Sequence, residues 1–109
     1  MITRSLATAT LRPMVLALLD GRPEYGYQII ARIRKLSGGE IDWTTGTLYP
    51  FLHGLENEGL VESFWQAAES APRRKYYRLT PAGERALEAE RTQWQQVHAM
   101  LAPLFAGGR

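Results

Sequence analysis

Residues Thr44 to Gly59 read TTGTLYPFLHGLENEG, and this stretch decides the fold of the chain. Either Thr44 or Thr45 can begin a helix, because a threonine side chain accepts a hydrogen bond from a backbone N–H at a helix start. Apolar residues then follow at the three- and four-residue spacing of one helix face; they are Leu48, Phe51, Leu52 and Leu55. Gly59 supplies the stop. Pro50 lies just past the first turn, where we expect a local widening or a later helix start, but no break.

The opposite face of this predicted helix carries small, polar or flat side chains. They are Thr47, Tyr49, Pro50, His53, Gly54 and Asn57. No lysine or arginine lies between Trp43 and Val61. A helix that is merely solvated normally carries charged residues on its outer face. This face is therefore suited to approach another surface closely.

The composition is that of one small globular domain. The chain has 109 residues, of which 45% are hydrophobic and 22% charged, and it has no cysteine. The length fits one domain, and the missing cysteines exclude disulfides, zinc–thiolate sites and cysteine nucleophiles. No apolar run approaches the roughly 18 residues of a membrane span, and Arg12 and Pro13 interrupt the stretch that a signal peptide would need. We therefore expect a cytoplasmic protein.

Two helices are predicted before the central stretch. The first is capped by Thr10 and runs to about Leu19, with Pro13 near its first turn, where a missing N–H costs little. Residues 1–9 form a frayed arm or an extra turn. A cluster of turn-forming residues separates this helix from the second, which covers residues 24–36.

Three residues around the second helix predict packing contacts. Gly26 costs a helix about 1 kcal/mol relative to alanine, so we expect another segment to approach it closely, with the first helix as the candidate. Ile41 and Trp43 lie in the connector before Thr44 and are expected to hold that connector against the core.

Two strand-like segments follow Gly59. LVESFW at residues 60–65 and RKYYRL at residues 74–79 are rich in branched and aromatic residues and roughly alternate in character. A turn predicted over residues 66–72 joins them into an antiparallel hairpin. The resulting fold class is mainly α with a small β-hairpin. The order helix, helix, helix, strand, strand is that of a winged helix-turn-helix, whose third helix enters the major groove of DNA.

A basic cluster lies on the second predicted strand. Arg73, Arg74, Lys75 and Arg78 fall within six positions with no acidic residue among them, although the net charge of the chain is only +2. Such a local cluster is typical of a patch that contacts phosphates; a solvated turn tip is the alternative. In a winged helix the cluster and the third helix face the same duplex, so one function explains both features.

We therefore predict a DNA-binding surface made by the third helix and the wing. Its residues are Thr44, Thr45, Gly46, Thr47, Tyr49, Pro50, His53, Arg73, Arg74 and Lys75. The helix has no arginine for a bidentate contact to guanine, so specificity must come from hydroxyl groups, methyl contacts, water and DNA shape. Affinity must come from the wing and helix N-termini, with Arg4 or Arg12 as further candidates. The alternative function is a winged-helix adaptor that binds protein and not DNA.

The last predicted helix carries a heptad pattern. Thr80 caps it, Pro81 is its first residue, and it runs to about Leu101, with Pro103 as its limit. Apolar residues at heptad steps form a seam: Leu87, Trp94, Val97, Leu101 and Leu104. A small domain cannot bury so long a helix, so we predict a homodimer in which Leu11 also lies at the interface. The alternative is packing against the first helix of the same chain.

The predicted organisation is a DNA-binding domain at residues 1–80 and a dimerisation helix with a flexible tail at residues 81–109. No constellation for catalysis or metal binding accompanies it. His53 and His98 lack a second ligand at metal spacing, and Glu56 and Glu58 do not share a helix face. We expect no enzymatic activity, no cofactor and no metal.

Three segments together resemble the PadR family of bacterial transcriptional regulators. They are GYQIIARI at residues 26–33, TTGTLYPFLHGLENEGLVES at residues 44–63 and PRRKYYRLTPAGERAL at residues 72–87. The resemblance covers roughly residues 11–101, and the single helix after the wing is similar to the small subfamily. It implies a homodimeric winged-helix protein, usually a repressor, that binds a palindromic operator near its own or an adjacent gene.

The resemblance also implies roles for individual residues. Thr47, Tyr49 and Pro50 fall in the groove-facing TLYP segment, and Arg73, Arg74 and Lys75 fall at the wing. Tyr76 and Tyr77 match paired wing tyrosines, one of which we expect to pack under the wing. Some relatives bind flat aromatic compounds between the C-terminal helices of the dimer. Trp94 is then either the stacking residue for a planar aromatic effector or ordinary dimer core.

Overall fold

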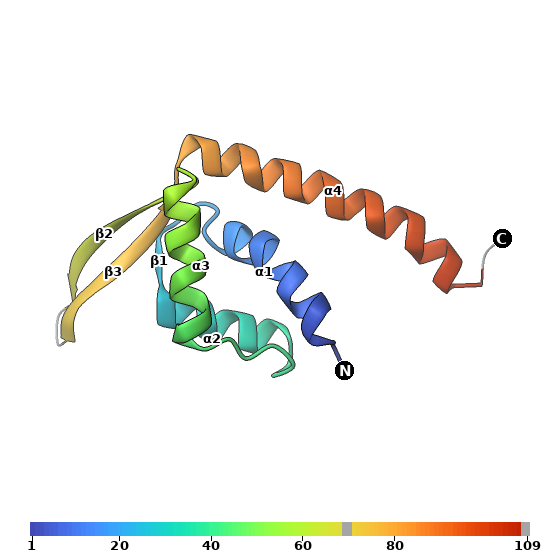
Figure 1. Ribbon diagram of the computed structural model, residues 1–109, viewed down its shortest axis with the longest axis horizontal. Helices are drawn as coiled ribbons and strands as arrows, with labels where there is room; N and C mark the ends of the chain where they lie inside the picture. The colour runs from blue at the N-terminus through green and yellow to red at the C-terminus, as the bar shows by residue number, and fades with distance from the viewer. Residues whose placement is uncertain (69–70, 108–109) are drawn as a thin grey trace.

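The computed structural model describes residues 1–68 and 71–107, which form four helices and one three-stranded antiparallel sheet (Figure 1). The elements in chain order are α1 (Arg4–Leu18), β1 (Glu24–Tyr25), α2 (Gly26–Leu36), α3 (Thr45–Asn57), β2 (Val61–Ala68), β3 (Ala71–Leu79) and α4 (Pro81–Phe105). The mainly helical fold with a small hairpin is confirmed. The predicted flexible end at residues 107–109 falls outside the described residues except for Gly107.

The core lies where α1, α2 and α3 meet. Leu16, Ile29 and Leu48 are fully buried there, and burial of each such side chain stabilises the fold by about 1.5–3 kcal/mol. From α3 the core receives Leu48, Leu52 and Leu55, which is the predicted apolar stripe. Ile41 is buried and Trp43 packs against the core, as predicted for the connector. The opposite face of α3 is consequently left outside.

The third helix begins where the sequence indicated. Thr44 is its N-cap residue, with an extended backbone, but its side chain accepts no backbone N–H. The Thr44 hydroxyl lies instead 3.4 Å from that of Thr47. Pro50 lies inside α3, which is neither broken nor delayed by it. At the far end Gly59 has a φ of +76°, a left-handed conformation that glycine adopts without strain, so the predicted stop is confirmed.

The predicted boundaries of the first helix are wrong. α1 begins at Arg4, because the Thr3 side chain accepts the Leu6 N–H at 3.2 Å and caps the helix there. Thr10 lies within the helix, and its hydroxyl donates to the Ala7 carbonyl oxygen at 2.8 Å. Pro13 therefore sits in the helix interior and not in the first turn. The second half of α1 is buried, and this burial offsets the one hydrogen bond that Pro13 cannot make.

The second helix begins later than predicted, because two residues before it form a strand. Glu24 and Tyr25 make β1, which pairs antiparallel with Tyr77 and Tyr76 of β3. The Tyr25 N–H donates to the Gln28 side chain at 3.1 Å and so marks the helix start. The Glu24 carboxylate is buried and forms an ion pair with Arg32.

The hairpin strands are longer than predicted. β2 and β3 pair from Val61↔Leu79 to Ala68↔Ala71, with an irregularity between Gln66 and Ala68. Most of the predicted turn over residues 66–72 is thus strand, because main-chain pairing continues past the end of the aromatic pattern. Residues 69–70 at the tip lie outside the described residues. The sheet order β1-β3-β2 places the basic strand β3 in the middle.

The fourth helix is fixed tightly at its start. The Thr80 hydroxyl accepts the Gly83 N–H at 3.0 Å and donates to the Gly59 carbonyl at 2.6 Å. A β-carbon on Gly83 would lie 1.9 Å from the Leu60 carbonyl oxygen. Only glycine therefore allows α4 to approach the turn after α3 this closely.

The fourth helix ends later than predicted. It continues past Leu101 to Phe105, with Pro103 inside its last turn. Proline removes a single bond to the preceding turn, which is not enough to stop the helix there. α4 contacts α1 along its first part, and its C-terminal part extends away from the rest of the chain (Figure 1).

Candidate nucleic-acid interface

The outer face of α3 is accessible and carries the predicted contact residues. Thr44, Gly46, Thr47, Pro50 and His53 are exposed, and Thr45 is half-buried. We call these six residues, together with Tyr49, the reading face. The buried stripe of α3 holds this face outward, so the arrangement suits insertion of the helix into a groove.

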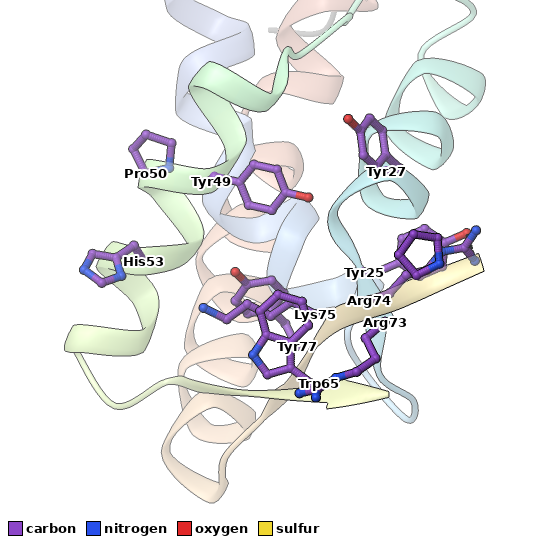
Figure 2. Close-up of a pocket in the computed structure, with 11 residues that line it drawn as sticks. Tyr25, Tyr27, Tyr49, Pro50, His53, Trp65, Arg73, Arg74, Lys75 and Tyr77 are labelled. Carbon is purple, nitrogen blue, oxygen red and sulfur yellow. Dashed lines mark hydrogen bonds between the residues drawn. The ribbon is translucent and has the colours of Figure 1, made fainter. Parts of the chain in front are cut away.

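Tyr49 differs from its neighbours, because its ring lies against α2. Figure 2 shows Tyr49 pointing from α3 toward Tyr27, on the other side of the helix from Pro50 and His53. A β-carbon on Gly26 would lie 2.6 Å from the Tyr49 hydroxyl oxygen. The close approach predicted at Gly26 is therefore real, but the partner is Tyr49 of α3 and not the first helix. Sequence analysis placed the start of this helix at residue 24 and not at Gly26, and it did not identify the contact with Tyr49.

The phenol of Tyr49 remains a hydrogen-bond donor at neutral pH. Burial raises the pKa of Tyr49, and Tyr27 adds to this effect. Burial also raises the pKa of Tyr77, with further contributions from Glu56 and Tyr49. Both hydroxyl groups therefore stay protonated and can donate to an acceptor.

Three cations of the wing are stacked on aromatic rings. The Arg73 guanidinium lies 5.6 Å from the Trp65 ring centre, and the Lys75 ammonium lies 5.8 Å from that of Tyr77. Arg74 lies 4.5 Å from the centre of the Tyr25 ring and also donates to its hydroxyl at 3.1 Å. Cation–π contacts orient these side chains while leaving their positive charge uncancelled.

Arg78 is the exception in the basic cluster. Its guanidinium donates to the Glu62 carboxylate at 2.7 Å and lies over Phe64. Within the described ranges 1–68 and 71–107, Arg73, Arg74 and Lys75 have no carboxylate within ion-pair distance. Of the four basic residues in the cluster, Arg78 is thus neutralised by Glu62, whereas Arg73, Arg74 and Lys75 can contact phosphates.

The paired tyrosines of β3 face opposite sides of the sheet. Tyr77 is only 3% exposed and packs beneath the wing, which confirms that one of the pair lies there. Tyr76 is on the other face, stacked on Phe64 and edge-on to Tyr25. Tyr77 thereby links the hairpin to the helices and fixes the height of the wing beside α3.

A hollow of about 920 Å³ separates the reading face from the wing (Figure 2). It is lined by Tyr25, Tyr27, Tyr49, Pro50, His53, Trp65, Pro72, Arg73, Arg74, Lys75 and Tyr77. Six of the ten predicted DNA-binding residues thus meet around one concave surface. Sequence analysis missed Tyr25, Tyr27 and Trp65. Their aromatic side chains were the signal available in the sequence, but β1 had to be known to place them beside α3.

The remaining predicted residues lie at the other end of α3. Thr44 and Thr47 border a second hollow of about 630 Å³, to which α1 contributes Arg4. Arg12, the other cation considered for DNA binding, is half-buried and forms ion pairs with Glu58 at 3.4 Å and Glu90 at 3.2 Å. Arg4 is therefore the better placed of the two to reach a phosphate.

The residues predicted for the dimer seam separate into two groups. Leu11 and Leu87 are only 5% and 4% exposed and pack in the core of their own chain. Trp94 and Val97 are half-buried, and Leu101 and Leu104 are exposed. The Trp94 indole N–H donates to Glu90 at 3.1 Å. Sequence periodicity could not separate Leu87 from the outer residues, because all of them lie on one stripe of α4.

No helix within 1–68 and 71–107 combines the length and apolarity needed to cross a membrane. In the same ranges no three histidine, cysteine, aspartate or glutamate side chains gather as metal ligands would.

The chain is similar to known transcriptional regulators. Residues 15–89 match the model of the transcriptional regulator PadR-like family. A PadR-like transcriptional regulator from Bacillus cereus is 26% identical, with 93% of this chain and 96% of that chain covered and a TM-score of 0.83. A PadR family regulator from Eggerthella lenta is 35% identical, with 93% and 86% covered and a TM-score of 0.74.

A third similar structure contains DNA. It is Bacillus subtilis PadR in complex with operator DNA, which is 25% identical and has a TM-score of 0.64. The match covers 72% of this chain and 45% of that chain.

Proposed function

The chain belongs to the PadR-like family of transcriptional regulators, and from this we propose that it is a homodimeric repressor of a palindromic operator. The family is one of regulators and not of enzymes. The observation that carries the proposal is the uncharged reading face of α3 beside three cations of the wing, for which residues 1–68 and 71–107 provide no ion-pair partner. Operator DNA bound to Bacillus subtilis PadR supports it. We propose the cytoplasm as the location, because operator DNA is the proposed partner.

In the proposed complex, the wing supplies most of the affinity for DNA and the reading face supplies the sequence specificity. Arg73, Arg74 and Lys75 neutralise phosphates of the duplex, which gives strong, salt-dependent and sequence-independent attraction. Thr47 and its neighbours approach the base edges, where a hydroxyl donates or accepts and a methyl group contacts thymine. Arg4 adds a phosphate contact near the N-terminus of α3.

We propose that the exposed half of α4 joins two copies. Met100, Leu101, Leu104 and Phe105 are 38–81% exposed in a single chain, which is unusual for a row of large apolar residues. Pairing them with a second copy removes this surface from water. The two reading faces would then bind half-sites about one helical turn apart, or roughly 34–36 Å. Residues 1–80 serve DNA binding and residues 81–109 serve assembly, with Leu87 joining the two parts.

We also propose an effector site at this seam. The half-buried indole of Trp94, oriented by its hydrogen bond to Glu90, presents a ring on which a planar aromatic compound can stack. Ordinary packing of Trp94 between two copies is the competing role. The two roles can be separated with a variant that retains Trp94 but carries Trp43→Phe and Trp65→Phe. When planar aromatic compounds are added to this variant, its fluorescence should change if Trp94 binds an effector and stay constant if Trp94 only packs between two copies.

The decisive experiment for the proposed function is DNA binding by the purified protein. We expect it to shift a fragment of its own upstream region, with affinity that falls steeply as salt rises. A protein-binding adaptor would show no salt-dependent affinity for duplex DNA. The absence of any shifted fragment at low salt would contradict the proposal.

A further inference from the structure

One charged residue interrupts the apolar stripe of α4. Glu90 lies between Leu87 and Trp94, at the heptad position where an apolar side chain would continue the pattern. Its side chain is only 17% exposed, so the carboxylate is largely removed from water. A charge in such a place is costly unless it is paired. The partners of Glu90 therefore explain how the stripe can carry it.

Both oxygens of the Glu90 carboxylate have a partner. One accepts the indole N–H of Trp94 at 3.1 Å. The other lies 3.2 Å from Nε of Arg12 in α1. A second nitrogen of the same guanidinium, Nη1, lies 3.4 Å from each carboxylate oxygen of Glu58. The four side chains thus form one series of contacts, which runs from α4 through α1, packed against it, to the end of α3 (Figure 1).

This series of contacts ends at the C-terminus of α3. Glu58 is the C-cap residue of that helix, and its backbone N–H donates to the Gly54 carbonyl oxygen at 3.0 Å. The C-terminal end of a helix carries a partial negative charge, which favours the guanidinium of Arg12 there. A displacement of Arg12 consequently acts on the last turn of α3, the helix that carries the reading face.

Arginine suits this bridge better than lysine does. A guanidinium is planar and directs several N–H groups along fixed directions, whereas an ammonium is a compact point charge on a flexible stem. Arg12 uses Nε for the carboxylate of α4 and Nη1 for that of α3. One rigid group therefore relates the orientations of two helices.

We propose that Arg12 is a positioning residue, which couples the surroundings of Trp94 on α4 to the end of α3 within one chain. Partly exposed ion pairs contribute little to stability, so this role concerns the relative orientation of the helices. The consequence for regulation rests on the proposed function. A change in packing at Trp94 alters the orientation of α3, and DNA bound to α3 alters Trp94 in return, because coupling between two sites is reciprocal.

The first test uses the full chain without DNA. Its readout is the indole signal of Trp94 in a nitrogen–proton correlation spectrum, identified by its loss in Trp94→Phe. Glu58→Gln should shift this signal, although Glu58 lies on another helix. The shift should vanish when the same change is made in an Arg12→Gln background, since the bridge is already absent. Equal shifts in both backgrounds, or no shift in either, would overturn the proposal.

Two further variants separate coupling from a general effect of charge. Glu56→Gln is the matched control for Glu58→Gln, because Glu56 lies on the same helix but accepts the Ser63 hydroxyl. It should leave the Trp94 signal in place, and a shift as large as that of Glu58→Gln would contradict the proposal. In an Arg12→Lys background Glu58→Gln should also leave the signal in place, since lysine keeps the charge without the two-sided bridge.

A second test adds an upstream DNA fragment. The fragment should shift the Trp94 signal in the wild type but not in Arg12→Gln. Arg12→Gln should lower the affinity about two- to fivefold, as expected for exposed ion pairs, with an unchanged salt slope. A shallower slope would make Arg12 a phosphate contact and overturn the positioning role.

The two tests fail separately. If the fragment binds but the variant cycle shows no coupling, this inference fails and the proposed function stands. If the cycle shows coupling but no fragment binds at low salt, Arg12 still joins α4 to α3 and the proposed function fails.

Discussion

The hydroxyl oxygen of Tyr49 lies 2.6 Å from the point where a β-carbon on Gly26 would be, so the two residues fit only because residue 26 has no side chain. Gly26→Ala should therefore displace the Tyr49 ring and destabilise the fold by about 1–3 kcal/mol, as overpacking does. In a Tyr49→Ala background the same change should be neutral or favourable, because alanine favours helix by about 1 kcal/mol. Urea denaturation of the wild type, the two single variants and the double variant gives the coupling free energy between Gly26 and Tyr49 directly. Equal costs in both backgrounds would contradict the contact.

Gly83→Ala should be more damaging than Gly26→Ala. The added β-carbon would meet the Leu60 carbonyl oxygen at 1.9 Å, and this backbone atom cannot rotate away. We expect a loss of at least about 2 kcal/mol in the free energy of unfolding. Gly54→Ala is the matched control, because nothing lies within 4 Å of its β-carbon position and alanine should stabilise α3. Thermal denaturation followed by circular dichroism measures both.

Arg73→Ala combined with Arg74→Ala should weaken binding to every DNA sequence. Each lost phosphate contact should reduce the slope of log affinity against log salt by about 1. Fluorescence anisotropy with a labelled duplex at several salt concentrations measures this slope. Arg78→Ala, whose guanidinium already pairs with Glu62, should change it much less. A similar loss in all variants would indicate a general effect of net charge.

Thr47→Ala should act on specificity. Its side chain is exposed on the reading face and carries both a hydroxyl and a methyl group. We expect the difference in binding free energy between the operator and a scrambled duplex to shrink by about 1–3 kcal/mol, the usual range for one base contact. The salt slope should be unchanged. A parallel loss on both duplexes would assign Thr47 to the phosphate backbone.

Leu104→Glu should dissociate the proposed dimer. Leu104 is 63% exposed in a single chain, so the change should leave the fold of that chain intact. Sedimentation velocity should show a monomer, and affinity for a palindromic site should fall because the two half-sites no longer bind together. Leu36→Glu, at a 71% exposed leucine of α2, is the control and should leave the sedimentation coefficient unchanged. A monomeric wild-type chain would refute the assembly.

Local patterns in the sequence were sufficient for the parts of the fold that local physics decides. The stripe of Leu48, Leu52 and Leu55, the stop at Gly59 and the cap at Thr80 all depend on residues within one or two helical turns. Their prediction needed only helix periodicity and the properties of glycine and threonine.

The parts that were missed depend on distant partners. Glu24 and Tyr25 are extended because they pair with β3, about fifty residues away. The neutralisation of Arg12 by Glu58 and Glu90 likewise joins three helices. Heptad spacing in α4 is continuous across residues that face the chain's own core and residues that face outward, so spacing alone could not assign Leu87. The hollow between α3 and the wing could not be predicted without β1, which contributes Tyr25 to its lining.

Tight contacts between the end of α3 and the start of α4 couple the orientation of the last helix, which acts as a lever, to that of the reading helix. Thr80 is bonded to Gly59, and Gly83 rests on Leu60, so α4 cannot pivot without moving the end of the reading helix. A helix of 25 residues is about 37 Å long, and a rotation of about 5° at its base moves its tip by about 3 Å, given that length. In the proposed dimer, the angle at which two levers cross therefore sets the preferred operator spacing. Substitutions at that crossing would retune the spacing without altering any residue that contacts DNA.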